Sequence, residues 1–170
     1  MILRGPRLTL TALDADGVEA MGASPLLDGV HELFAARLRD DPGSIGFWVW
    51  VGTIADGTEV AAGGFGGRPG DNARLTVGYH VHEDHRGAGY ATELLDLLTT
   101  WALAQPGVSS VRATIKPENA ASLRVAEKAG FEQVGRTRTD EDGELLVFLR
   151  ARENRPGETC PGPAPGHVPR

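Results

Sequence analysis

A glycine turn directly before a long amphipathic helix is the feature that most constrains this chain. The stretch DHRGAGYATELL begins at Asp84, and its glycines fall within residues 86–89, just before apolar residues at helical spacing. Backbone N–H groups at a strand-to-helix turn form a nest for anionic oxygens, and the helix dipole favours negative charge there. The pattern predicts either a plain tight connection or a phosphate site. It is neither a P-loop nor a G-x-G-x-x-G dinucleotide fingerprint.

Length, charge and cysteine content exclude several classes of protein. The chain has 170 residues, the length of one ordinary domain, and its net charge of -6 argues against a nucleic-acid partner. It contains no apolar run of about 18 residues, so we expect no membrane partner and a cytoplasmic location. The only cysteine, Cys160, excludes an intramolecular disulfide. No His, Cys, Asp or Glu cluster has the spacing of metal ligands, so we expect no metal site.

Strand and helix patterns alternate along residues 1–151. They predict helices at 26–41, 90–105 and 120–130, and strands at 7–13, 46–54, after Asp56-Gly57, and at 73–81, 109–115, 131–139 and 145–150. The segment from 73 to 115 is long enough for a right-handed βαβ crossover. We therefore expect an α/β (α+β) fold, a single layer of mixed, mostly antiparallel sheet of about seven strands flanked by helices.

The last residues differ in composition from the rest. The final twenty hold five of the eleven prolines and almost no large apolar side chains. Such a segment buries too little surface to offset its ordering entropy. We predict a domain at residues 1–151 and a Pro/Gly-rich disordered tail at 152–170, with docking on a neighbour as the alternative.

A second motif, IKPENAASLRVAEKAGF, follows the next predicted strand. Asn119 is a plausible helix N-cap and Ser122 lies in the first turn, where its hydroxyl could simply face solvent. Together, RGAGYATELL and NAASLRVAEKAGF resemble the GNAT superfamily of acetyl-CoA-dependent N-acetyltransferases, most closely the branch that acetylates ribosomal-protein N-termini at alanine or serine. Arg86, Gly89 and Ala91 match that family's R/Q-x-x-G-x-G/A turn. The resemblance is carried by residues from about Leu75 to Gly135.

The resemblance implies where the substrate acetyl-CoA binds. In the family two parallel strands splay apart, here 75–81 and 109–115, and the pantetheine arm lies in the gap. The pyrophosphate is expected on the N–H groups of residues 86–91, and Asn119 matches the position that hydrogen-bonds the arm. The expected cofactor-binding residues are thus Val81, His82, Arg86, Gly87, Ala88, Gly89, Tyr90, Ala91 and Asn119.

Acetyl transfer to an amine needs a base, an N–H group for the oxyanion and a proton for the leaving sulfur. A backbone N–H near Val81 could serve the oxyanion. The resemblance implies Ser122 as the acid, because Ala126 stands where many members have a tyrosine. Thr76 stands where the ribosomal-protein branch often has a carboxylate, which leaves a water wire, His80 or His82 as the base.

We therefore expect an acyltransferase that moves an acetyl group from acetyl-CoA to a primary amine. The acceptor is expected to be a protein N-terminus or a small amine, such as an aminoglycoside-like antibiotic or a polyamine. Homodimers are common among such enzymes. The alternatives are a non-catalytic acyl-CoA-binding or sensing domain, and a self-assembling module with an unused phosphate nest.

Overall fold

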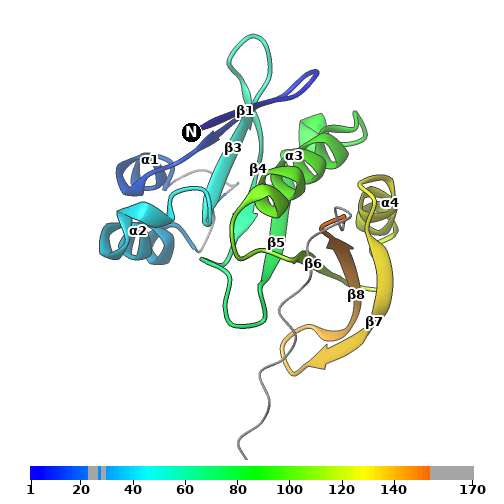
Figure 1. The fold of residues 1–170 in the computed structure, drawn as a ribbon. Helices are drawn as coiled ribbons and strands as arrows, with labels where there is room; N and C mark the ends of the chain where they lie inside the picture. Colours follow the sequence, from blue (N-terminus) through cyan, green and yellow to red (C-terminus); the bar gives the residue numbers. More distant parts are fainter. Residues whose placement is uncertain (23–26, 28–29, 154–170) are drawn as a thin grey trace, which may run out of the picture.

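The computed structural model describes residues 1–22, 27 and 30–153, and their strands form one sheet (Figure 1). The strand order is β1-β2-β3-β4-β5-β6-β8-β7. The strands are β1 (Ile2–Arg4), β2 (Thr9–Ala12), β3 (Val49–Thr53), β4 (Glu59–Phe65), β5 (Arg74–Val81), β6 (Ser110–Ile115), β7 (Glu132–Thr139) and β8 (Gly143–Ala151). The helices are α1 (Ala15–Ala20), α2 (His31–Asp40), α3 (Tyr90–Ala104) and α4 (Ala120–Lys128), with 3-10 turns at Pro42–Ser44 and Glu83–His85.

Helices cover both faces of the sheet. The buried residues of α3, among them Leu94, Leu95 and Leu98, pack in one apolar core with alternate residues of β4 and β5. A smaller core on the opposite face joins Val18 of α1 and Leu38 of α2 to the other side of β3 and β4. This two-sided packing follows from strand geometry, because successive side chains of a strand point to opposite faces.

The strands β5 and β6 separate along their length. They are the one parallel pair among the described strands, and they pair only from Arg74–Thr76 to Ser110–Arg112. Beyond that point β5 continues to Val81, still paired with β4, and β6 continues to Ile115, still paired with β8. The splayed parallel pair expected from the family resemblance is therefore confirmed.

The N-terminal part departs from the sequence-based expectation. The strand expected at 7–13 is β2, but it pairs with an additional strand, β1, that the sequence did not predict, so the described sheet has eight strands instead of about seven. Helix α1 was not expected from the sequence; Asp14 caps it by accepting a hydrogen bond from the Gly17 N–H at 2.9 Å. The helix expected at 26–41 begins at His31 in the structure. Helix α1 has only six residues, too few for a periodic pattern to be recognised.

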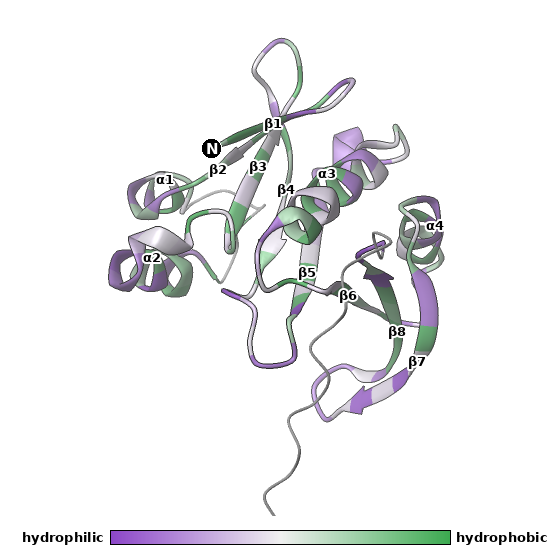
Figure 2. Cartoon of the chain, in the orientation of Figure 1, coloured by the Kyte–Doolittle hydropathy of each residue, from purple (hydrophilic) through white to green (hydrophobic). Residues whose placement is uncertain are grey.

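The C-terminal strands form the other edge of the sheet. Figure 2 shows that β8 is mostly hydrophobic whereas β7, the edge strand, is mostly hydrophilic. A polar edge strand protects a sheet from pairing with other chains. Most of the predicted tail, with Cys160, lies outside the described residues. Arg152, the first residue of the predicted tail, is bound to the domain, because its guanidinium donates to the Leu103 and Gln105 carbonyls at 2.8 and 2.7 Å.

Candidate active site

A cavity of about 570 Å³ lies between the start of α3 and the helix α4. It is on the face of the sheet that α3 covers, at the end where β5 and β6 have separated. The cavity brings together most of the site residues predicted from the sequence: Val81, Arg86, Gly87, Gly89, Tyr90, Ala91, Asn119 and Ser122. We refer to it below as the α3/α4 cavity.

The glycine turn gives α3 an open N-terminus. Gly87 and Gly89 have φ angles of 77° and 85°, the left-handed region that glycine adopts without strain. The first turn closes where the Glu93 N–H donates to the Gly89 carbonyl at 3.2 Å. The N–H groups before Glu93 have no acceptor inside the helix, as at any helix start. The turn thus has the backbone form of an anion nest, although phosphate binding itself stays a prediction.

An ionic anchor from the N-terminal hairpin holds this turn in place. Glu93 accepts hydrogen bonds from the N–H groups of Arg7 and Leu8, both at 2.8 Å, and from the Arg7 Nε at 3.1 Å. Burial favours the protonated acid, but these hydrogen bonds and the Arg7 charge outweigh it and lower the pKa of Glu93. Arg7 also donates to the Ala88 carbonyl and lies over the Tyr90 ring. The anchor therefore fixes the glycine turn against the sheet.

The unpaired edge of β5 exposes backbone N–H groups to the gap. The His82 N–H donates to the Val60 carbonyl at 2.8 Å, so this pair is hydrogen-bonded across β4 and β5. Because bonded and non-bonded pairs alternate in an antiparallel ladder, the Tyr79 and Val81 N–H groups point away from β4, toward β6. The Val81 carbonyl accepts the Arg86 Nε at 3.1 Å. Val81 is therefore placed to present an N–H, whereas the His82 N–H is already used.

Two predicted cofactor-binding residues lie outside the walls of the α3/α4 cavity. His82 is not among its lining residues, and its Nδ1 lies 3.8 Å from the Asp84 carboxylate. Ala88 does not line the cavity either, and its carbonyl faces Arg7. Their contact with acetyl-CoA stays a prediction.

Two hydroxyl groups face each other where the cavity reaches β5. The Asn119 side chain caps α4 by accepting the Ser122 N–H at 3.1 Å, which confirms its expected capping role. The Tyr79 hydroxyl is buried and makes no regular hydrogen bond. Burial raises the pKa of Tyr79, and the nearby Ser122 hydroxyl lowers it in part. A protonated phenol thus lies beside Ser122 at neutral pH.

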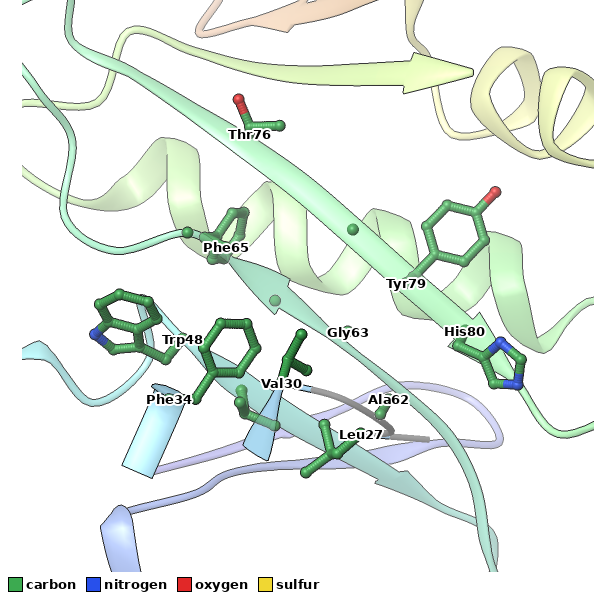
Figure 3. Close-up of a pocket in the computed structure, with 14 residues that line it drawn as sticks. Leu27, Val30, Phe34, Trp48, Ala62, Gly63, Phe65, Thr76, Tyr79 and His80 are labelled. Atoms are coloured by element: carbon green, nitrogen blue, oxygen red, sulfur yellow. The ribbon is translucent and has the colours of Figure 1, made fainter. Parts of the chain in front are cut away.

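A second cavity of about 280 Å³ lies on the opposite face of the sheet (Figure 3). It is bordered by the start of α2 and by β3, β4 and β5, and we call it the α2 cavity. Tyr79 and His80 line both cavities. The two cavities therefore border the same two residues of β5, beyond the point where β5 leaves β6.

Besides the Tyr79 phenol, His80 is the titratable side chain that lines both cavities. Partial burial lowers the pKa of His80, and its electrostatic interactions with Arg86 and His82 lower it further. The imidazole is therefore largely neutral at pH 7 and able to accept a proton. Within the described residues, no group of three or more His, Cys, Asp or Glu could hold a metal ion, and no helix is long and apolar enough to cross a membrane.

Comparison with known proteins decides what this arrangement is. The profile of the family described as "Acetyltransferase (GNAT) domain" matches residues 7–132, which include the anchor, both cavities and the glycine turn. The chain belongs to the GNAT acetyltransferase family. It is thus an acyltransferase whose acetyl donor is acetyl-CoA. We expect the α3/α4 cavity to hold the coenzyme, and we refer to it below as the coenzyme cavity.

Relatives of this GNAT chain differ in the amines that their names mention. The uncharacterized N-acetyltransferase YjdG of Bacillus subtilis is 32% identical over 118 residues, which cover 68% of this chain and 70% of the relative. A structure of RimL, a ribosomal L7/L12 alpha-N-protein acetyltransferase in complex with coenzyme A, has a TM-score of 0.69 at 18% identity and covers 89% of this chain and 98% of its own. A spermidine N-acetyltransferase chimera from Vibrio cholerae and hSSAT has a TM-score of 0.68 at 14% identity, over 86% and 96% of the two chains. These two structures establish the GNAT fold and leave the acceptor open.

Sequence reasoning missed several residues of this GNAT site. The family motif points to a tyrosine on α4, where this chain has the fully buried Ala126, and it gives no indication of Tyr79 on β5. Glu93 and Arg7 are 86 positions apart, and no local pattern joins them. The signal for Tyr79 was present, since it directly precedes His80 on a strand already expected to border the gap.

Proposed function

We propose that this protein transfers the acetyl group of acetyl-CoA to a primary amine by direct attack, the amine being a protein N-terminus or a small molecule. The observation that carries the proposal is that two cavities, one on each face of the sheet, are both lined by Tyr79 and His80. A donor in one cavity and an amine in the other would meet at the point where β5 and β6 separate. Such positioning supplies much of the rate enhancement of a two-substrate reaction.

The coenzyme cavity suggests a division of binding roles. The N–H groups of residues 86–91 would hold the pyrophosphate, and the Asn119 amide would contact the pantetheine arm. The Val81 N–H, which points into the gap, would donate to the carbonyl oxygen as negative charge develops on it. Arg86 supports this last role indirectly, because its bond to the Val81 carbonyl holds the adjoining Val81–His82 peptide group.

His80 is the base in this proposal. The amine must lose a proton as its nitrogen bonds to the acetyl carbon, and a largely neutral imidazole between the cavities is suited to take it. Related enzymes often carry a carboxylate at the position that Thr76 occupies here. Thr76 lies four residues before His80, on the same face of β5. His80 thus lies on the face where a base is needed.

Ser122 and Tyr79 act together on the leaving sulfur. When the carbon–sulfur bond breaks, the sulfur takes a proton, and the Tyr79 phenol stays protonated at neutral pH because burial raises its pKa. Ser122, held in the first turn of α4, would donate to the sulfur and be resupplied by Tyr79. This keeps Ser122 as the acid and adds the hydroxyl that supports it.

Steady-state release of coenzyme A from acetyl-CoA, with a panel of primary amines, tests the proposal. We expect turnover, and we expect His80→Asn to lower kcat by roughly a hundredfold, within the range of general-base catalysis. In the parent, kcat/KM should stay high down to a pH below 6.5, because the pKa of His80 is lowered. In His80→Asn, kcat/KM should no longer stay high at acidic pH. It should instead rise with pH as the amine itself loses its proton.

His82→Asn is the matched comparison, because the sequence left both histidines open as the base. A larger loss of kcat in His82→Asn would move the base to that residue. Tight binding of acetyl-CoA without turnover of any amine would favour the acyl-CoA-sensing alternative. Absence of coenzyme A binding in calorimetry would overturn the proposed function.

A further inference from the structure

The α2 cavity has a chemistry of its own that bears on the identity of the acceptor. It is lined mostly by apolar side chains from distant parts of the chain, among them Leu27, Val30, Phe34, Trp48 and Phe65 (Figure 3). None of its fourteen lining residues in the described part of the chain carries a carboxylate. The cavity is therefore poorly suited to a second positive charge.

The aromatic wall of the α2 cavity is fixed before any ligand arrives. The Trp48 indole N–H donates to the Ser44 Oγ at 2.9 Å, so the polar atom of the ring is already satisfied. The Phe34 and Trp48 rings lie 5.4 Å apart between centroids, at an angle of 49°. Gly67 lies close behind the indole, where an added Cβ would come within 3.2 Å of the ring. The wall thus presents ring surface, not hydrogen-bonding groups, to the cavity.

Gly78 is what keeps the α2 cavity open. Thr76, Gly78 and His80 alternate along one face of β5, and all three line the cavity. A Cβ built at Gly78 would meet no atom within 4 Å, and Gly78 is not among the residues with positive φ. Glycine is therefore not required there by the backbone or by crowding. The empty space beside His80 is available to a ligand.

We propose that the acceptor is a primary amine whose neighbouring carbon carries a compact apolar group, aromatic or branched aliphatic, that fills the α2 cavity. The inference rests on the proposed function, and it deepens it by naming the class of amine. The volume is sufficient, since a cavity of about 150 Å³ already holds benzene in an apolar protein interior. The amine nitrogen would lie at His80 and the apolar group beside Phe34 and Trp48.

The same argument disfavours polyamines. A linear polyamine that placed one nitrogen at His80 would bring a second ammonium among apolar side chains, and an unpaired buried charge is costly. An α-amine with an apolar side chain brings only the nitrogen that reacts. The chemistry is shared by a free apolar amine and by a peptide that begins with a large apolar residue, and the test separates these two sources.

Coenzyme A release is measured with matched acceptors at one pH. The probes are phenylalanine amide, glycine amide, peptides that begin with phenylalanine or with glycine, and spermidine. We expect kcat/KM to be roughly ten- to a hundredfold higher for each phenylalanine probe than for its glycine counterpart, from burial of one aromatic side chain. A higher value for the peptide than for the amide would assign the source to protein N-termini, and the reverse to small amines.

Gly78→Leu sharpens the test, because it fills the α2 cavity from its floor. It should remove the preference for phenylalanine over glycine while leaving acetyl-CoA affinity within about twofold, which also shows that the variant is folded. Gly78→Ala should give a smaller loss in the same direction. Gly135→Leu is the matched control on β7, since its Cβ also meets no atom within 4 Å and it lines neither cavity.

Failure of this inference can be distinguished from failure of the proposed function. Turnover with equal or better kcat/KM for spermidine or the glycine probes, or an unchanged preference in Gly78→Leu, would overturn this inference and leave the proposed function standing. Binding of acetyl-CoA with no turnover of any probe would overturn the proposed function, and the inference with it.

Discussion

The two cavities that border Tyr79 and His80 are built in different ways. The coenzyme cavity is made mainly from two short continuous segments, 85–92 and 119–128. The α2 cavity takes its walls from segments as far apart as Leu27 and His80. The coenzyme cavity is therefore encoded mostly by local sequence, whereas the α2 cavity exists only after distant segments have folded together.

This difference has a chemical reason. A pyrophosphate is the same in every molecule of acetyl-CoA, and backbone N–H groups at a helix start recognise it with few side chains. An acceptor is recognised by the shape and polarity of side chains, which distant residues can change without altering the fold. Variants that affect only one cavity test this separation, and they follow in order of expected effect.

The largest effect is expected beside Tyr79, which lines both cavities. Ser122→Ala should lower kcat by roughly ten- to a thousandfold, with acetyl-CoA affinity nearly unchanged, because a proton donor is lost but the binding contacts remain. The Asn119 cap survives, since it uses the Ser122 backbone N–H. Steady-state kinetics and calorimetry on the same variant provide the measurement.

Tyr79→Phe is the companion to Ser122→Ala. If the two hydroxyls act on one route, the double variant should be little worse than the more impaired single variant. Additive losses would separate the two residues. An unchanged kcat in Ser122→Ala would remove Ser122 from the mechanism.

At the glycine turn, a large effect on acetyl-CoA affinity is expected. Gly89→Val must hold a φ of 85°, and its Cβ would lie 3.0 Å from the Arg7 guanidinium. Strain of this kind costs on the order of 1–3 kcal/mol, so relaxation of the turn away from this conformation should lower acetyl-CoA affinity by roughly five- to a hundredfold. Calorimetric titration with acetyl-CoA measures it.

Gly143→Val is the control for strain alone, because Gly143, the first residue of β8, has a φ of 74° with no atom within 4 Å of an added Cβ. It should lose stability yet keep acetyl-CoA affinity. Equal affinity in Gly89→Val and the parent would mean that the turn is only a connection.

The smallest effect is expected at the anchor. Glu93→Gln keeps the shape of the side chain but weakens its charge-assisted hydrogen bonds to residues 7 and 8, at a cost of about 1–3 kcal/mol in unfolding free energy. Because the pKa of Glu93 is lowered on folding, its contribution is present above the unfolded pKa of about 4.3 and is lost as pH falls through the folded value. Urea unfolding of both proteins from pH 7 to pH 3 measures this. If the difference in unfolding free energy between the parent and Glu93→Gln did not shrink as the pH falls, charge would not be what stabilises the anchor.

The fold could be predicted largely from the sequence. Helix α3 was expected at 90–105 and spans Tyr90–Ala104, and β7 was expected at 131–139 and spans Glu132–Thr139. Both have strong local signals, either a helical apolar period or clear turn residues at their ends. Strand β1 and helix α1 escaped prediction because elements of three to six residues carry too little pattern.

The sequence by itself determined the glycine turn, the Asn119 cap and the family motifs, because each depends on residues close together in the chain. Only the tertiary structure decided that the Tyr79 hydroxyl lies beside Ser122, that Glu93 holds residues 7 and 8, and that Phe34, Trp48 and Gly78 enclose one apolar space. The physical reason is that backbone conformation responds to neighbouring residues. Side-chain contacts instead depend on how strands pair and helices pack across the whole domain.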